Sequence, residues 1–429
     1  SFSQLLEIQR RRLGPEHPAT IDAMKNLAST YSWQAKYAQA EALYIQTIAI
    51  ATRVLGPEHP DTLACMGNLA GAYDDEGKYA ESETLQRKTL ELRRRILGPE
   101  HRGTLWSMQS LSQALFHQKK FAEAAALDEQ TLEIQRKVLG PDHPDTLDTM
   151  NSLSIMLEQL GKFREAETLS SQALEIQRHS LGPESPDTLQ SMGTLAQFQM
   201  DRGEYAEAEA LCRQALVIQR RVVGSEHPDT LLVMLDLGLA LTYQGKYAEA
   251  EPLLNQTLEI RRRVSGAENP DTLGVMRALA SAYQRQAKYV QADALYTQIL
   301  AARRRVSGPD DPDTLDTMAD LSSSYLAQDK FSASEALSRE AVDGGKKARP
   351  DSWQTFFAES LLGASLAGRK KYTEAEPLLL EGYRGMLARR DRIAAPDQYH
   401  VERAHQWLLQ LYKDWGKPDK AAEVAKESN

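Results

Sequence analysis

Cysteine and long apolar runs are scarce in this 429-residue chain, and both absences limit what it can be. The two cysteines, Cys65 and Cys212, lie far apart and each falls on the apolar face of a predicted helix. We therefore expect two buried thiols rather than a disulfide or a catalytic pair. No run of about 18 apolar residues occurs, so we expect no membrane span and no membrane partner. A reduced, cytoplasmic setting fits these absences.

An excess of basic residues is also lacking, and so are catalytic motifs. Lys and Arg number 51 against 60 Asp and Glu, which gives a formal charge of −9 and argues against nucleic-acid binding. Zinc-protease, serine-hydrolase, phosphate-loop and protein-kinase signatures are missing. We therefore predict no enzymatic activity, no catalytic residues, no cofactor and no metal.

What the chain does contain is a repeat of 42 residues, read most clearly as LGPEHPDT at residues 55–62. The recurring glycines are Gly14, Gly56, Gly98, Gly140, Gly182, Gly224, Gly266 and Gly308. A fixed period of this size is typical of a solenoid of stacked supersecondary units. One elongated stack is therefore expected in place of the two or three domains that the length alone would suggest.

Each repeat carries two amphipathic helical patterns. In the second repeat, Leu63, Met66 and Tyr73 fall on one helical face, and Leu85 and Leu90 fall on the face of the next helix. Neither helix could bury its stripe alone, so each antiparallel pair must stack on its neighbours.

One loop position holds five of the nine histidines, a concentration that could suggest metal ligands. The eight residues at this position are His17, His59, His101, His143, Ser185, His227, Asn269 and Asp311. Because Ser, Asn and Asp are N-cap residues and proline follows in seven of the eight repeats, we predict helix capping. The nearby glycine is expected to end the preceding helix in a left-handed conformation.

Arginines crowd the ends of the second helices, as in residues 93–95 and 303–305. They could form a basic patch for anionic partners. We favour the simpler interpretation that they lie at the negative helix ends and are balanced by Glu58, Glu100 and Glu226 in the loops.

The pattern resembles the tetratricopeptide repeat, in particular the kinesin light chain type, over about residues 1–345. In the second repeat the signature residues are Leu69, Ala70, Tyr73, Gly77, Tyr79, Ser82 and Thr89. The usual period of about 34 residues is exceeded here. The resemblance implies an all-α fold, an α-solenoid in which antiparallel helix pairs form a right-handed superhelix.

Three regions are expected along the chain. Residues 1–16 form the truncated helix of a preceding repeat, residues 17–345 form eight helical hairpins, and residues 346–429 form atypical C-terminal hairpins and a cap. Because the chain begins inside a predicted helix, we expect a piece of a longer protein. Residues 343–350 are predicted to be a linker, since Gly344, Gly345 and Pro350 replace the regular turn. The C-terminal stretch resembles the end of repeat regions attached to bacterial serine/threonine kinases, which implies a bacterial origin.

The resemblance also implies a concave groove lined by the first helix of each pair. Asn and Gln side chains in a groove can pair with an extended peptide backbone. The positions carried over as partner-binding residues are Lys25, Asn26, Asn68, Trp106, Gln109, Asn151, Gln197, Leu235, Asp236, Arg277 and Asp320. A clamp for chaperone C-terminal carboxylates is not expected, because Trp106 and Ser110 stand where basic residues are needed. Leu232, Leu235 and Leu239 either line the groove or pack against adjacent helices.

These observations predict a non-enzymatic protein–protein interaction scaffold that binds a peptide or protein partner in the groove. A ligand with apolar anchors and basic residues would suit it, and the chain should be a monomer or self-associate weakly. One alternative stays open, a regulatory or self-assembly module of a larger signalling protein such as a bacterial serine/threonine kinase. Oligomers formed through residues 350–429 would favour that alternative.

Overall fold

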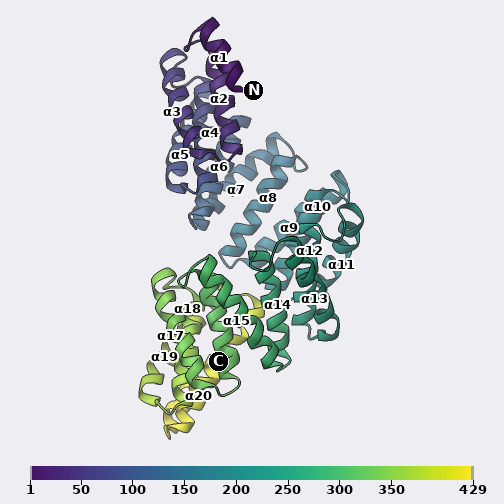
Figure 1. Cartoon of the computed structure of the whole chain (residues 1–429), viewed down its shortest axis with the longest axis vertical. Coiled ribbons are helices and arrows are strands. Elements are labelled where there is room, and N and C mark those ends of the chain that lie inside the picture. Colours follow the sequence, from purple (N-terminus) through teal and green to yellow (C-terminus); the bar gives the residue numbers. More distant parts are fainter. Residues whose placement is uncertain (1, 427–429) are drawn as a thin grey trace. The chain divides into compact units, whose positions relative to one another are not determined.

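The computed structural model describes residues 2–426, and every regular element in that range is a helix (Figure 1). The predicted all-α architecture of stacked helix pairs is confirmed. The chain divides into two compact units, residues 1–180 and 181–429, which are described separately. Within residues 2–426, no helix combines the length and the hydrophobicity that a membrane crossing requires.

The first helix of each repeat begins at the residue after the capping position. In chain order these helices are α2 (Pro18–Trp33), α4 (Pro60–Glu76), α6 (Arg102–His117), α8 (Pro144–Gln159), α10 (Pro186–Asp201), α12 (Pro228–Tyr243), α14 (Pro270–Arg285) and α16 (Pro312–Leu326).

The second helices are mostly 18 residues long. They are α3 (Tyr37–Val54), α5 (Tyr79–Leu97), α7 (Phe121–Val138), α9 (Phe163–Ser180), α11 (Tyr205–Val222), α13 (Tyr247–Val264), α15 (Tyr289–Val306) and α17 (Phe331–Ala348). The helix α1 (Phe2–Leu13) precedes the first pair and packs on α2.

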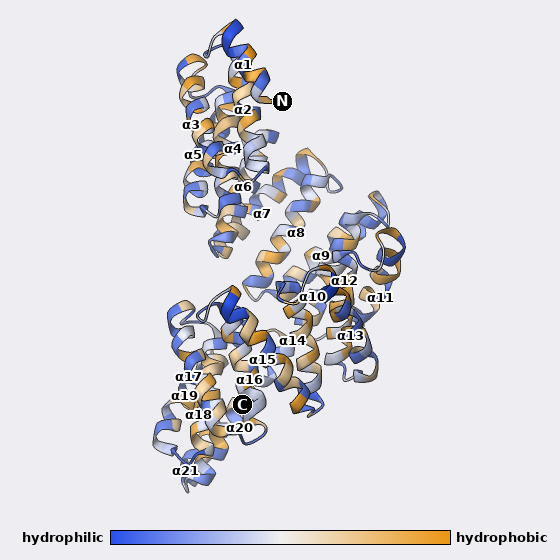
Figure 2. Cartoon of the chain, viewed as in Figure 1, coloured by the Kyte–Doolittle hydropathy of each residue, from blue (hydrophilic) through white to orange (hydrophobic). Residues whose placement is uncertain are grey.

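Small residues at two repeated positions bring the two helices of a pair together. Ala28 and Ala40 of the first pair are fully buried, as are Ala280 and Ala292 of the seventh. Hydrophobic residues alternate with hydrophilic ones along the helices, while the loops are largely hydrophilic (Figure 2). Burial of one apolar stripe per helix between neighbouring helices is what holds each stack together.

The histidines of the repeated loop cap the first helices. His59 Nδ1 accepts a hydrogen bond from the Asp61 backbone N–H at 3.2 Å, and His227 Nδ1 accepts one from Asp229 at 3.3 Å. Asn269 and Asp311 cap their helices in the same way. Among the described residues Ser185 makes no side-chain cap bond, although it holds the same extended conformation. The capping prediction is thus confirmed for every capping residue except Ser185.

A repeated threonine completes the loop, and its role was not predicted. Thr62 Oγ1 donates to the Gly56 carbonyl oxygen at 2.9 Å, and Thr230 Oγ1 donates to that of Gly224 at 2.8 Å. The eight repeated glycines have φ between 86° and 101°, where only glycine is unstrained. Glycine and threonine together fix the turn from one pair to the next.

The predicted linker at residues 343–350 is wrong, because α17 continues to Ala348. A Cβ on Gly344 would lie 2.5 Å from Leu315 Cδ2, and one on Gly345 would lie 2.7 Å from Thr355 Oγ1. These glycines serve close packing of α17 against its neighbours. A pair of glycines predicts the end of a helix only where no packing contacts stabilise the helix at that point.

Beyond α17 the chain forms one further pair and a terminal segment. These elements are α18 (Trp353–Gly368), α19 (Tyr372–Leu387), the 3₁₀ turns η1 (Arg390–Arg392) and η2 (Ala395–Asp397), α20 (Tyr399–Asp414) and α21 (Pro418–Val424). The α18 helix is buried along most of its length. Helix α20 packs on both α18 and α19, and the hydrophobic core of the second unit extends to Val424 of α21.

Candidate functional site

The first helices contact one another along each unit, as α2 contacts α4 and α10 contacts α12. We call the face they line the inner face. Cavities open on this face in both units, one between α6 and α8 and one between α14, α16 and the C-terminal segment. The predicted partner-binding residues belong to these first helices, so the inner face is the candidate site.

In the first two pairs, the predicted residues already interact with neighbouring side chains. Lys25 Nζ lies 2.7 Å from Asp22 Oδ1 and 3.7 Å from Asp61 Oδ1. Asn26 Nδ2 donates to Asp22 Oδ2 at 3.2 Å. Asn68 is half-buried beside the phenol of Tyr44, which is itself fully buried. A partner binding here would have to compete with these contacts.

A cavity of about 560 Å³ lies in the first unit between the third and fourth pairs. It is lined by Trp106, Gln109, Ser110 and Gln113 of α6, by Asp148, Ser152 and Ile155 of α8, and by Asp128 of α7, among others. We call it the Asp128 pocket. It brings the predicted residues Trp106 and Gln109 together, whereas Asn151 lies outside its lining.

Trp106 and Gln109 are held in place by different contacts. A Cβ on Gly67 would lie 2.7 Å from Trp106 Cζ3, so the absence of a side chain there lets the ring lie against α4. The buried Arg93 guanidinium lies 5.2 Å from the Trp106 ring centroid. Gln109 Nε2 donates to Thr149 Oγ1 at 2.9 Å. Even so, 43% of Trp106 remains exposed to a partner.

The fifth and sixth pairs contribute less accessible residues. Gln197 Nε2 donates to Asp201 Oδ1 at 3.1 Å. Asp236 is only 8% exposed, and burial raises its pKa to about 7. Leu235 is half-buried against the core and lines the cavity of the second unit together with Leu239. Leu232, in contrast, is exposed.

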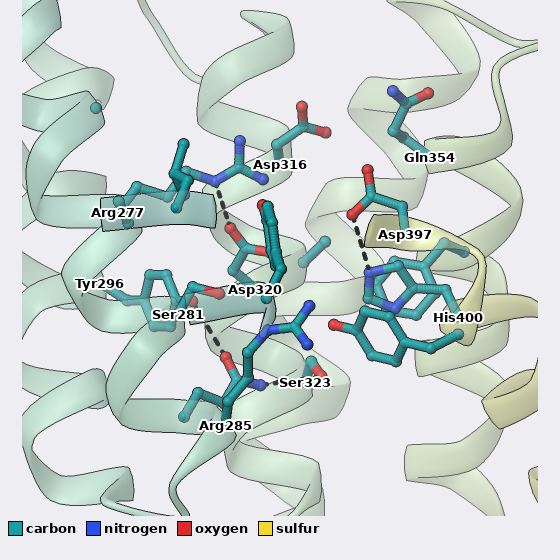
Figure 3. A pocket seen from close by; sticks show the side chains of 18 of the residues that line it. Arg277, Ser281, Arg285, Tyr296, Asp316, Asp320, Ser323, Gln354, Asp397 and His400 are labelled. Carbon is teal, nitrogen blue, oxygen red and sulfur yellow. Dashed lines mark hydrogen bonds and ion pairs between the residues drawn. The ribbon is translucent and has the colours of Figure 1, made fainter. Parts of the chain in front are cut away.

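The cavity in the second unit has a volume of about 420 Å³ and is shown in Figure 3. Two predicted residues meet in it, because Arg277 Nε donates to Asp320 Oδ2 at 2.7 Å. Asp316 is also in the lining and pairs with Arg349. The ion pairs leave these groups mutually satisfied.

The C-terminal segment covers this cavity. Asp397 of η2 and Tyr399 and His400 of α20 belong to its lining. Arg285 of α14 donates to the Pro396 carbonyl oxygen at 3.4 Å, and its guanidinium lies 5.2 Å from the Tyr399 ring centroid. The inner face near Arg277 and Asp320 is therefore less open to an extended peptide than sequence reasoning expected.

His400 is a buried titratable group of this cavity. It is 6% exposed, and burial lowers the pKa of its imidazole well below the ordinary value. Its Nε2 lies 3.9 Å from Asp397 Oδ1. The ring lies 3.9 Å, centroid to centroid, from Phe357. A neutral histidine packed on an aromatic ring acts here as part of the core.

Sequence reasoning missed Asp128, Asp397, Tyr399 and His400. Asp128 lies on a second helix, whereas the resemblance places groove residues on first helices. A signal existed, because the same position of the repeat holds Tyr44, Gln86, Asp128, Ser170, Cys212, Leu254, Tyr296 and Ser338, where one acid stands among neutral residues. No comparable pattern marks the C-terminal residues.

The loops and cysteines show no competing site. Within residues 2–426, no cluster of three His, Cys, Asp or Glu side chains could hold a metal ion. Arg221 pairs with Glu184 at 2.5 Å, Arg263 with Glu226 at 2.6 Å, and Arg95 with Glu58. Glu58 and Glu226 thus balance arginines as we favoured, whereas Arg93 and Arg303 are buried and donate to backbone carbonyl oxygens. Both cysteines are free and buried, and burial raises the pKa of Cys65 to about 11.

Comparison with known families finds one match. A model described as tetratricopeptide repeat matches most of the chain, in overlapping segments. The matched residues are 22–81, 70–137, 111–179, 187–263 and 271–347. The chain beyond residue 347, including the stretch that resembles kinase-attached repeats, lies outside these matches. No curated protein matches the chain.

Several solved structures are similar. A putative kinesin light chain of Podosopora anserina with nearly identical TPR-like repeats is 32% identical, covers 48% of this chain and 98% of its own, and has a TM-score of 0.45. BtubC (BKLC) of P. vanneervenii is 20% identical, with coverages of 54% and 92% and a TM-score of 0.46. The apo form of RapI is 16% identical, with coverages of 65% and 96% and a TM-score of 0.50, a likeness of fold alone.

Proposed function

Because the chain belongs to the tetratricopeptide repeat family, we propose that it is a non-enzymatic scaffold that binds a peptide or protein partner on its inner face. Repeats of this family are typical of protein–protein interaction. The observation that carries the proposal is the Asp128 pocket, an open cavity between two first helices. A stack of helix pairs offers a partner such an extended face more readily than an enclosed catalytic centre.

The open part of the inner face lies in the first unit. Trp106 is 43% exposed and Ile155 is 37% exposed at the Asp128 pocket, and such partly exposed large side chains can anchor a partner. In the second unit, η2 and α20 already cover the inner face. We therefore assign partner binding primarily to α2, α4, α6 and α8. Both cysteines are free thiols, which supports the cytoplasmic setting we propose.

The test is affinity capture from the source organism's lysate with the intact chain and with Lys25→Glu, Asn68→Ala and Trp106→Ala combined. A matched control combines Lys88→Glu, Gln46→Ala and Ile45→Ala, which change exposed residues of α3 and α5. We expect specific partners to be lost only from the inner-face variant, with both variants folded by circular dichroism. Capture that survives the inner-face changes would refute the site. Oligomers in light scattering would favour the self-assembly alternative.

A further inference from the structure

Asp128 lines a cavity at a position where two other pairs carry a large aromatic residue. The same position of the repeat holds Tyr44 in the first pair and Tyr296 in the seventh. Both tyrosines are buried. Their hydroxyls reach the first helix, where Tyr44 bonds Ser29 at 2.7 Å and Tyr296 bonds Gln284 at 3.1 Å. Aspartate is far shorter than tyrosine. The space that a ring fills in those pairs is left open in the third pair.

The Asp128 carboxyl group is buried and only partly hydrogen-bonded. It is 1% exposed, and its Oδ2 atom has no hydrogen-bond partner within the described chain. Burial raises its pKa to about 7, and the nearby Ser112 hydroxyl opposes that shift only in part. A buried carboxylate normally has a cation or several donors beside it. A cation or a strong hydrogen-bond donor would satisfy this Oδ2 oxygen.

The walls of the Asp128 pocket suit a cation with an apolar stem. Asp145 and Asp148 also line it, while its described lining residues include no Lys or Arg. Trp106, Phe116 and Ile155 supply aromatic and aliphatic surface to the lining. Aromatic faces attract guanidinium groups, and carboxylates bind them through two parallel hydrogen bonds.

We propose that the Asp128 pocket binds an arginine side chain of the partner peptide, with the guanidinium at the Asp128 carboxylate and the stem against Trp106 and Ile155. This inference rests on the proposed function, because it assumes that a peptide lies on the inner face. It adds the chemistry of the ligand, a peptide segment with an arginine anchor. A lysine would reach the same carboxylate but would lack the planar fork and the stacking.

The test pans a phage-displayed library of random dodecapeptides on the full chain and on three variants. Asp128→Asn removes the charge at constant shape. Asp128→Tyr fills the cavity with the residue that the first and seventh pairs carry. Asp142→Asn removes the same charge from an exposed loop position and serves as the control.

The expected result is that peptides selected on the full chain share an arginine. Their affinity should fall at least about tenfold when that arginine is changed to citrulline, which keeps the shape and loses the charge. Asp128→Asn and Asp128→Tyr should show the same loss, and Asp142→Asn should bind like the original chain.

Two other results are distinguishable. Selected peptides that carry no arginine, or that bind Asp128→Asn and the original chain equally, would overturn the arginine pocket and leave peptide binding on the inner face standing. Failure to select any peptide above background on the folded chain would count against the arginine pocket and the proposed function together.

Discussion

Lys246 Nζ lies 2.7 Å from Glu209 Oε2, a contact that joins the fifth and sixth helix pairs. The same relationship joins Lys78 to Glu41 at 2.8 Å. Lys246 stands in the short turn between α12 and α13, so each of these lysines ties a hairpin turn to the second helix of the preceding pair. At these two positions the lysine before the second helix thereby links neighbouring pairs.

Glu209→Gln should destabilise the second unit by about 1 kcal/mol at pH 7. Lys246, helped by Arg213 and Gln244, lowers the pKa of Glu209 to about 2 against the opposing effect of burial. Because the folded pKa is depressed, the stabilisation is present above the unfolded pKa of about 4.3 and is lost as pH falls through about 2.

Urea unfolding followed by circular dichroism at several pH values measures this effect. Glu207→Gln, an exposed neighbour on the same helix, is the control. A stability difference for Glu209→Gln that stayed constant down to pH 2 would rule out the charge pairing as its cause.

Asp128→Asn should stabilise the first unit at pH 8. Burial raises the folded pKa of Asp128 to about 7, above its unfolded value of about 3.9. When the folded pKa of an acid is raised, the folded state loses stability as the pH rises from the unfolded pKa towards the folded pKa. At pH 8 the Asp128→Asn variant should therefore be more stable than the original chain by up to about 4 kcal/mol. The gain should vanish near pH 4. Thermal melts between pH 4 and pH 8 measure this gain, with Asp142→Asn as the control. A lower stability of Asp128→Asn than of the original chain at pH 8 would contradict the account.

His227→Ala should cost about 1 kcal/mol, because the Asp229 backbone N–H loses the acceptor that caps α12. His227→Asn should retain most of that stability, since Asn269 caps α14 at the equivalent position. Ser185→Ala should change little, because the described Ser185 side chain makes no cap bond. Denaturant midpoints of the three variants measure these changes in stability. Equal losses of stability from Ser185→Ala and His227→Ala would argue against a capping role for His227.

Gly345→Ala should destabilise the second unit by about 1–3 kcal/mol, because the new Cβ would lie 2.7 Å from Thr355 Oγ1. Gly274→Ala is the matched control, since a Cβ there meets no atom within 4 Å among the described residues. That control should be neutral or stabilised by up to about 1 kcal/mol. Calorimetry of both variants measures the loss, and a harmless Gly345→Ala would contradict the close-packing role of this glycine.

The repeat made the helix pairs predictable, because caps, glycines and apolar positions recur in register and the eight copies can be compared. His59 could be assigned to capping only because Asn269 and Asp311 share its position. Features that occur once were missed. Gly344 and Gly345 have the same sequence signal as a turn, and only their contacts with Leu315 and Thr355 reveal packing.

The candidate site was predictable to the extent that it follows the repeat. Trp106 and Gln109 lie at the Asp128 pocket as first-helix residues should. Asp128 reaches the same pocket from a second helix, which spacing along one helix cannot show. The cover over Arg277 depends on contacts such as that between Arg285 and Pro396, 111 residues apart, and no periodic pattern encodes those.

The most direct test of partner binding on the inner face is hydrogen–deuterium exchange of the full chain with and without a peptide selected on it. We predict slower exchange in α6 and α8, whose side chains line the Asp128 pocket, and no change in α13 and α15. Protection confined to the second helices or to the loops, with α6 and α8 unchanged, would contradict binding on the inner face.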